Sequence, residues 1–171
     1  MIWKLFRLYC KFFWTDEKFA RYIGVKIGKK CFIATRNFGS EPYLIEIGDN
    51  VQITKGVSFA NHGGSWVLRK YDPKFDFFGK IKIGNNVYIG NNSIILPGVT
   101  IGDNVLIAAG SVVTKSVEKD CIVGGNPARV IGNVVSLYEK TKPYNVQTKG
   151  MSYKEKMELL LSLEENKFIK K

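Results

Sequence analysis

The chain contains one histidine, His62, and its position makes it the residue best suited to acid–base chemistry. A neutral imidazole can accept a proton from a hydroxyl near neutral pH, so a histidine beside a bound substrate can act as a general base. A lone histidine is more often an ordinary surface or core residue. His62, however, directly precedes Gly63 and Gly64, where a regular repeat stops and an insertion begins. We therefore predict a catalytic role for it.

The chain around His62 follows a repeat of six residues that is clearest over residues 83–118. Each unit opens with a β-branched apolar residue and has a valine or serine at its fifth position. The opening residues are Ile83, Ile89, Ile95, Ile101, Ile107 and Val113. A period of six matches neither the 3.6 of an α-helix nor the 2 of a simple strand. It is typical of a parallel β-helix built from hexapeptide repeats, which is an all-β fold.

In such a fold each hexad forms one short strand and one turn, and three hexads complete a coil of about 18 residues. The opening residue points inward and stacks on its equivalent in the next coil, about 4.8 Å away. Isoleucine and valine suit this stack because their side chains are stiff and fill a pleated surface. Steps such as Gly84-Asn85-Asn86 supply the turns, since glycine and asparagine tolerate positive φ.

The repeat is broken twice, over residues 36–44 and again over residues 63–80. Hexads also begin earlier, at Ile27, Ile47 and Ile53. A long unpatterned insertion in a solenoid is usually functional, so we predict a functional role for the loop at 63–80. After the last full hexad, residues 122–131 are expected to form a final partial coil.

We expect the chain to divide into three parts. Residues 1–24 form an N-terminal helical segment, residues 25–132 form the β-helix domain with its extruded loop, and residues 133–171 form a C-terminal helical extension. The extension is predicted to contain a short helix at its start. A second amphipathic helix follows a capping box made by Ser152 and Glu155.

The chain has 171 residues, enough for one principal domain, and a net charge of +11 at neutral pH. Such a charge favours anionic partners, among them nucleic acid, acidic lipid and a polyanionic cofactor. The basic residues are scattered and form no recognition motif, so we do not expect nucleic acid to bind.

Residues 2–13 interleave basic with aromatic and aliphatic residues at helical spacing. This segment can pack on the β-helix or a neighbouring subunit, or make peripheral contact with an anionic membrane.

The cysteines and the hydropathy of the chain indicate in which cellular compartment we expect the protein. Cys10, Cys31 and Cys121 are odd in number and far apart in sequence, which is simplest to explain by a reducing cytosol. No apolar run reaches the ~18 residues of a membrane span. No signal peptide is expected, because basic residues interrupt the N-terminal apolar ones. We therefore expect a cytoplasmic location, with the inner face of the membrane as the second interpretation.

Several motifs together resemble one family. These are the hexad run, Asn61-His62 before the insertion, Val113-Thr114-Lys115, and the Gly-Asn-Pro-Ala-Arg-Val-Ile stretch at residues 125–131. They resemble the hexapeptide-repeat acyltransferases, and in particular the sugar and polysaccharide O-acetyltransferases near maltose, galactoside and capsule acetyltransferases. The resemblance covers roughly residues 27–131.

The resemblance implies a left-handed β-helix that forms a homotrimer, with each active site between neighbouring subunits. The sequence alone does not give the hand, because the usual crossover rule favours right-handed connections. The implied donor is acetyl-CoA, and the implied acceptor is a hydroxyl of a sugar or glycan. His62 matches the family's general base, the alkoxide attacks the thioester directly without an acyl-enzyme, and a backbone N–H stabilises the oxyanion.

Further site residues follow from the same resemblance. On the acceptor side they are Asn37, Glu41, Asn61 and Trp66. On the cofactor side they are Tyr88, Gly90, Ala109, Thr114, Lys115 and Arg129. The family commonly has tryptophan where this chain has Tyr88. Lys115 can also be an ordinary solvated charge, and Trp66 can instead pack on a neighbouring subunit.

The same residues bear on three alternative functions. Zinc carbonic anhydrases of the β-helix type need three histidine ligands, and this chain has one, so no metal is expected. N-acetyl transfer to an amino sugar, or transfer of a longer acyl group, is the nearest enzymatic alternative. A basic β-helix scaffold that binds membrane or nucleic acid is the non-enzymatic alternative.

Overall fold

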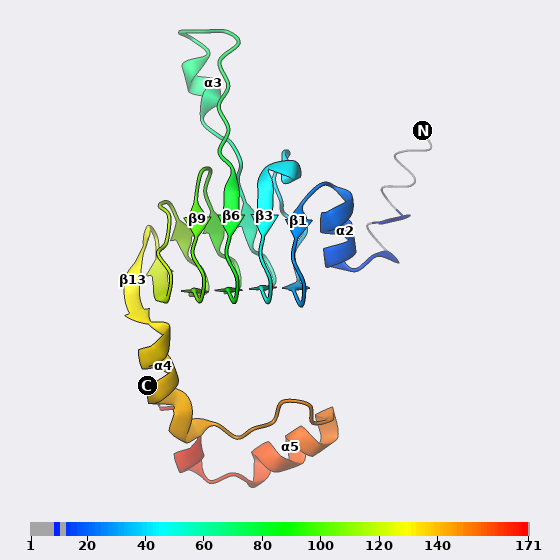
Figure 1. The fold of residues 1–171 in the computed structure, drawn as a ribbon, viewed down its shortest axis with the longest axis vertical. Helices are drawn as coiled ribbons and strands as arrows, with labels where there is room; N and C mark the ends of the chain where they lie inside the picture. Colours follow the sequence, from blue (N-terminus) through cyan, green and yellow to red (C-terminus); the bar gives the residue numbers. More distant parts are fainter. Residues whose placement is uncertain (1–8, 11–12, 171) are drawn as a thin grey trace. The chain divides into compact units, whose positions relative to one another are not determined.

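Short parallel strands form three sheets, which we call A, B and C (Figure 1). The computed structural model describes residues 9–10 and 13–170. Sheet A contains β1 (Lys26–Ile27), β3 (Ile45–Ile47), β6 (Ile81–Ile83) and β9 (Thr100–Ile101). Sheet B contains β2 (Phe32–Ile33), β4 (Gln52–Ile53), β7 (Tyr88–Ile89), β10 (Leu106–Ile107), β12 (Cys121–Gly125) and β13 (Ala128–Asn133). Sheet C contains β5 (Ser58–Phe59), β8 (Ile94–Ile95) and β11 (Val112–Val113).

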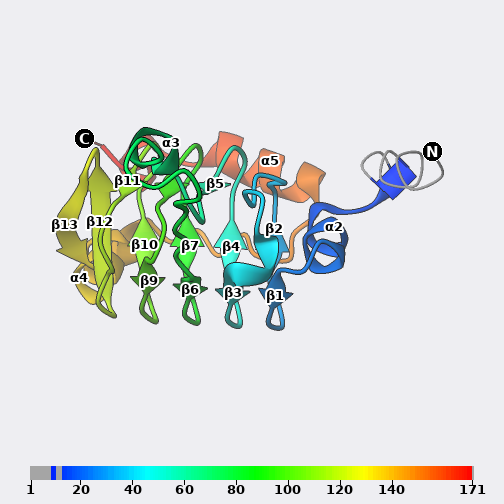
Figure 2. The same cartoon turned by 90° about the horizontal axis from the view of Figure 1, so that it is seen from above.

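From β3 to β11, successive strands pass from sheet A to B to C and back to A, so the chain winds as a three-sided coil (Figures 1 and 2). The opening residues of the hexads lie in register, as in the row formed by Ile47, Ile83 and Ile101. All three are buried, because the row faces the inside of the coil where apolar surface is removed from water. The predicted parallel strands and their inward stacking are thereby confirmed.

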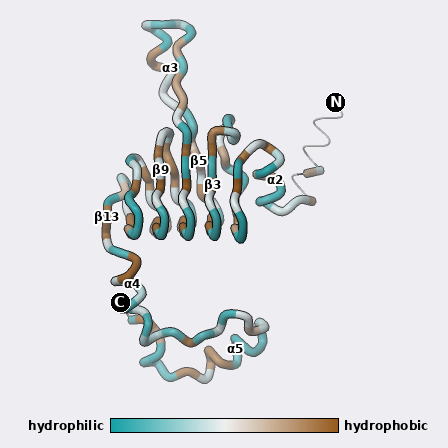
Figure 3. Tube along the Cα trace, in the orientation of Figure 1, coloured by the Kyte–Doolittle hydropathy of each residue, from teal (hydrophilic) through white to brown (hydrophobic). Residues whose placement is uncertain are grey.

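The corner between sheets A and B repeats almost unchanged from coil to coil. Asn50, Asn86 and Asn104 all have a positive φ, between 54° and 56°. Their side chains are joined by hydrogen bonds of 2.7 Å from Asn50 to Asn86 and 2.8 Å from Asn86 to Asn104. These turns are the hydrophilic stretches along the lower edge of the coil in Figure 3. The predicted role of the Gly-Asn steps as turns is confirmed.

The two breaks in the repeat both lie at the corner between sheets C and A. The first contains the short helix η1 (Pro42–Leu44), and the second contains α3 (Ser65–Leu68). The second break leaves the coil as a long loop above β6 (Figure 1). Its two ends meet, because the Gly79 amide donates to the Asn61 carbonyl at 2.7 Å. The coil therefore resumes its register after the loop.

The last strands differ from the expected partial coil. β12 does continue sheet B beside β10, but β13 turns back and pairs with β12 in the antiparallel direction. The expectation for residues 122–131 is therefore right for the first half and wrong for the second. A strand that returns as a hairpin covers the free edge of β12, which a coil would have left open.

A short helix precedes the first strand of the coil. α2 (Asp16–Tyr22) begins at Thr15, whose side chain accepts from the Lys18 amide at 3.3 Å. The predicted contact of residues 2–13 with a membrane or a subunit falls largely on residues 1–8 and 11–12, which lie outside the described residues.

The residues after Val134 form a separate compact unit. The first helix of this unit, α4 (Val134–Thr141), begins one residue before the boundary. It is followed by η2 (Lys142–Tyr144), α5 (Tyr153–Ser162) and η3 (Glu165–Lys167). The predicted short helix and the capping box of Ser152 and Glu155 are both confirmed. The three-part division of the chain at residues 24 and 132 stays a prediction.

Candidate active site

His62 lies at the corner between sheets C and A, directly after β5 and at the start of the insertion. Its Nε2 atom is 2.8 Å from the Ser40 hydroxyl oxygen and 3.4 Å from Oε2 of Glu41. The Ser40 hydroxyl also lies 3.0 Å from the Glu41 carboxylate. A hydroxyl can donate one hydrogen bond and accept two, so Ser40 can connect the imidazole to the carboxylate. The His62 side chain is 39% exposed, and Glu41 is 17% exposed.

The corner brings together residues that are 22 positions apart because the first break lies one coil before the second. Glu41, predicted from sequence to orient His62 or contact the acceptor, does lie beside the imidazole. Ser40 was not predicted. No local period connects the two breaks, and the only signal in the sequence was that Ser40 adjoins Glu41 in the first break.

Asn61 and Asn37 differ in their burial and in their neighbours. Asn61 is fully buried, and its side-chain amide has no hydrogen-bond partner among the described residues. A Cβ atom at Gly39 would come within 2.6 Å of its Oδ1 atom, so only glycine lets the first break pack against it. Asn37 extends sheet C into the first coil through a bridge to Ser58, and its side chain is exposed. Substrate contact by either residue stays a prediction.

The insertion places the ring of Phe78 beside His62, a contact that the sequence did not predict. The Phe78 ring lies 5.4 Å from the imidazole, and the two residues also form an antiparallel bridge. Trp66 is on α3 and is 81% exposed. The loop is held instead by Asp76, which accepts from the Ser65 hydroxyl at 2.7 Å. A role for Trp66 in acceptor binding stays a prediction.

The predicted cofactor residues fall into two groups. Gly90 and Ala109 are stacked at the corner between sheets B and C, where a Cβ atom on Gly90 would come within 2.5 Å of the Ala109 nitrogen. Tyr88 precedes this corner on β7 and points outward from sheet B.

The second group lies further along the coil. Thr114 and Lys115 follow β11 at the corner between sheets C and A, two coils beyond His62. Lys115 and Arg129 line one groove of about 300 Å³, which also includes Cys121. Lysine and arginine together suit phosphate groups. Within one chain, Gly90 and Ala109 lie at a different corner of the coil from His62.

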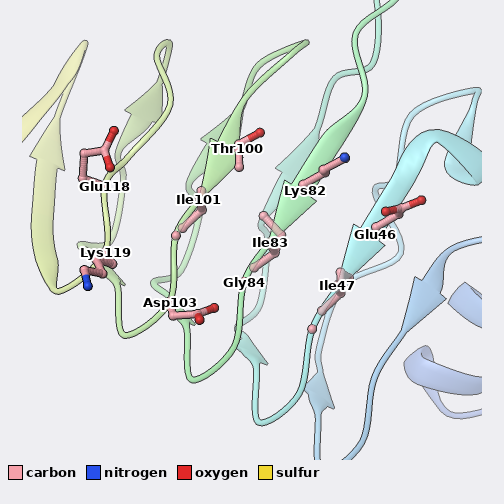
Figure 4. Close-up of a pocket in the computed structure, with 12 residues that line it drawn as sticks. Glu46, Ile47, Lys82, Ile83, Gly84, Thr100, Ile101, Asp103, Glu118 and Lys119 are labelled. Carbon is pink, nitrogen blue, oxygen red and sulfur yellow. The ribbon is translucent and has the colours of Figure 1, made fainter.

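Another groove, of about 670 Å³, runs along the outer face of sheet A (Figure 4). Glu46, Lys82 and Thr100 lie side by side across its strands. It contains no imidazole and no residue predicted for the site.

Among the described residues, no group of three side chains is arranged to bind a metal ion. No helix in the described part of the chain is long and apolar enough to cross a membrane.

Comparisons with known proteins agree with this geometry. The sequence signature of the bacterial transferase hexapeptide family (six repeats) matches residues 80–115. Protein CapG of Staphylococcus aureus is 49% identical over 158 residues, which cover 90% of this chain and 92% of CapG. Galactoside O-acetyltransferase of Escherichia coli is 45% identical over 96 residues, which cover 55% of this chain and 46% of that protein.

A solved structure extends the comparison to three dimensions. A hexapeptide-repeat acetyltransferase of Vibrio cholerae, in complex with acetyl coenzyme A, matches with a TM-score of 0.59 and 34% identity. The match covers 65% of this chain and 61% of that one. The chain belongs to the hexapeptide-repeat transferase family. The resemblance predicted from the sequence is thereby confirmed.

Proposed function

We propose that the protein transfers the acetyl group of acetyl-CoA to a hydroxyl of a sugar or glycan precursor, with His62 as the general base. The observation that carries the proposal is the position of Nε2 within 2.8 Å of a hydroxyl oxygen, that of Ser40, at a solvent-accessible corner. The reaction class is supported by the family. It is also supported by the Vibrio cholerae relative, which was solved with acetyl coenzyme A.

The chemistry needs one base and one carbonyl. The imidazole takes the proton of the acceptor hydroxyl as its oxygen attacks the carbonyl carbon of the thioester. The new C–O bond forms, the C–S bond breaks, and the proton passes from the imidazolium to the coenzyme A sulfur. A backbone N–H stabilises the oxyanion of the tetrahedral intermediate. No acyl-enzyme is required.

We further propose that the protein is a homotrimer with its sites between subunits. One chain carries His62 and Ala109 at different corners of the coil, so a second copy is needed to bring them together. The outer face of sheet B supports such a contact. A row of paired residues crosses it, which we call the apolar row because every position except Gln52 is apolar: Phe32, Gln52, Tyr88, Leu106 and Ile122. Exposed apolar patches of this kind mark interaction surfaces. We also infer a left-handed winding, as the family resemblance implies.

Coenzyme A is proposed to lie along that interface. Tyr88, Gly90 and Ala109 would contact the pantetheine arm, and the groove of Lys115 and Arg129 would hold the nucleotide phosphates by charge and paired donors. The donor is a cytosolic metabolite and the three cysteines are free, so we propose a cytoplasmic enzyme. Contact of residues 2–13 with the membrane remains a separate hypothesis.

The test is release of free coenzyme A when the purified protein is mixed with acetyl-CoA and a panel of glycans. We expect His62→Ala to lower kcat by about 10²–10⁴-fold, the usual contribution of a positioned base. Coenzyme A affinity, measured by calorimetry, should not change. Turnover that survives the substitution would exclude His62 as the base. Mass spectrometry of the product separates an ester from an amide, or an acetyl from a longer acyl group.

A further inference from the structure

The hydrogen bonds among Glu41, Ser40 and His62 can run in only one direction. An ionised carboxylate accepts hydrogen bonds and has no hydrogen to donate. Oε2 of Glu41 lies 3.0 Å from the Ser40 hydroxyl oxygen, so the single hydroxyl hydrogen of Ser40 is donated to the carboxylate. Ser40 then has only lone pairs left for the imidazole. Because Nε2 of His62 lies 2.8 Å from the same oxygen, Nε2 must supply the hydrogen of that contact.

A second contact of the imidazole agrees with this direction. Nε2 lies 3.4 Å from Oε2 of Glu41, where a nitrogen that carries hydrogen is attracted to the carboxylate and a bare lone pair is repelled. The Glu41 side chain is mostly buried, so water screens this interaction incompletely. If Ser40 donated to Nε2 instead, the carboxylate would face two lone pairs with no hydrogen between them. Both contacts therefore place the ring hydrogen on Nε2.

The other ring nitrogen is left to act as the base. In a neutral imidazole only one nitrogen carries hydrogen, so Nδ1 has the lone pair that can accept a proton. No group in the described part of the chain is hydrogen-bonded to Nδ1. We infer that Nδ1 is the basic nitrogen of His62, and that Ser40 and Glu41 are positioning residues that keep the ring hydrogen on Nε2. The inference rests on the proposed function and adds to it the atom that accepts the proton.

The proton then follows a complete cycle through one side of the ring. As the acceptor oxygen attacks the carbonyl carbon of acetyl-CoA, its proton passes to Nδ1. The imidazolium that forms has hydrogen on both nitrogens, and its Nε2–H group continues to donate to Ser40. The nearby Glu41 carboxylate stabilises the positive charge. Nδ1 gives its proton to the coenzyme A sulfur as the C–S bond breaks, so the ring regains its starting tautomer without rotating.

The first test blocks Nδ1 chemically. His62 is replaced by Nδ1-methylhistidine through an expanded genetic code, which leaves Nε2 as the only nitrogen able to accept a proton. The acceptor is the glycan that supports turnover by the wild type. We expect kcat for coenzyme A release to fall by about 10²–10⁴-fold, as in His62→Ala, because the base is lost. Coenzyme A affinity, measured by calorimetry, should stay the same. Turnover well above that of His62→Ala would overturn the inference, because Nε2 would then be the base.

The second test needs no acceptor and observes the ring directly. The chain has one histidine, so nitrogen-15 NMR of the untagged, histidine-labelled protein gives one pair of ring signals. At about pH 9, where an imidazole is neutral, we expect a single tautomer with hydrogen on Nε2. Ser40→Ala should shift the ring toward a mixture of tautomers and lower kcat by about five- to tenfold. Ser40→Thr keeps the hydroxyl and should restore both.

The matched control is Ser162→Ala in the C-terminal unit, where the hydroxyl donates to the Leu159 carbonyl at 2.8 Å. It should change neither the tautomer nor kcat. Hydrogen on Nδ1 in the wild type, or an unchanged tautomer ratio in Ser40→Ala, would overturn the inference. Failure of the proposed function has a different signature, because His62→Ala would then keep its turnover. If His62→Ala is inactive but the methylated protein is active, only the assignment to Nδ1 is wrong.

Discussion

Asparagine at the corner between sheets A and B meets two structural demands with one side chain. Its backbone takes a left-handed conformation that asparagine tolerates better than most residues. Its amide both donates and accepts, so each one can bond to the coil before and the coil after. The row ends where Asn104 donates to Asp120 at 3.1 Å. Glycine would meet the conformational demand but could make no side-chain hydrogen bond.

Substitution of Asn86 separates the two demands. Asn86→Gly loses only the amide hydrogen bonds, and we expect the free energy of unfolding to fall by about 1 kcal/mol. Asn86→Ala also places a Cβ in the left-handed region, which costs a further 1–2 kcal/mol, roughly. Urea unfolding at fixed protein concentration measures both. Equal losses would mean that the backbone conformation contributes nothing.

Lys30 provides the matched control. It has the same positive φ, 55°, in the first coil, and no side-chain hydrogen bond links it to the row of asparagines. We therefore expect Lys30→Gly to be neutral or slightly stabilising in the same experiment, by relief of backbone strain.

At the scale of elements, the insertion is held by a carboxylate rather than by an apolar core. Asp76 accepts from the Ser65 hydroxyl and from the Phe77 amide, and lies 3.4 Å from Arg69. The hydrogen bond from the Ser65 hydroxyl is the main cause that lowers the pKa of Asp76. The hydrogen bond from the Phe77 amide and the positive charge of Arg69 lower it further. Ionised Asp76 therefore contributes to the contacts that hold the loop.

Because ionised Asp76 helps to hold the loop, we expect the loop to lose structure in acid. Because the folded pKa of Asp76 is lowered, its contribution is complete above the ordinary aspartate range and disappears as the pH falls through the lowered value. We expect the Trp66 indole N–H resonance to be constant from neutral pH to about pH 5 and to shift below that. In Asp76→Asn the shifted position should appear at every pH. A resonance that titrates identically in both proteins would contradict the assignment.

The periodic elements of this fold can be predicted from the sequence, whereas contacts between its irregular segments cannot. Rows such as Ile53, Ile89 and Ile107 follow from periodicity, because each residue repeats the environment of its equivalent in the next coil. The contact between Ser40 and His62 joins two irregular segments, so no periodic pattern contains it. The reversal at β13 was also missed, because its valine and isoleucine residues suit a hairpin as well as a coil.

At the scale of the molecule, the sheets of the coil present different surfaces. The outer face of sheet A alternates in charge, with Lys26 and Glu46 paired at 2.8 Å and Lys82 on the next strand. The hydrogen bond from Lys26 is the main cause that lowers the pKa of Glu46. Glu46 therefore stays ionised at neutral pH, and a face with charged side chains suits contact with water. The apolar row on sheet B suits contact with protein.

If sheet B contacts a neighbouring subunit, the base and the coenzyme site come from different chains, and two inactive variants should complement each other. His62→Ala removes the base, and Ala109→Trp blocks the predicted pantetheine contact. Each homotrimer should be nearly inactive in the coenzyme A release assay. Equal, randomly mixed subunits should recover roughly a quarter of the wild-type rate, because a site is intact only when an intact His62 and an intact Ala109 meet from neighbouring chains.

The mixed assembly is made by unfolding and refolding the two variants together, and native mass spectrometry verifies that trimers have formed. The control is the same mixture without refolding, in which the homotrimers stay separate and no activity should appear. Mixed trimers as inactive as either parent would show that His62 and Ala109 serve the same chain's site. That result would leave the apolar row on sheet B without a role in catalysis, because subunit contact there would then serve stability alone.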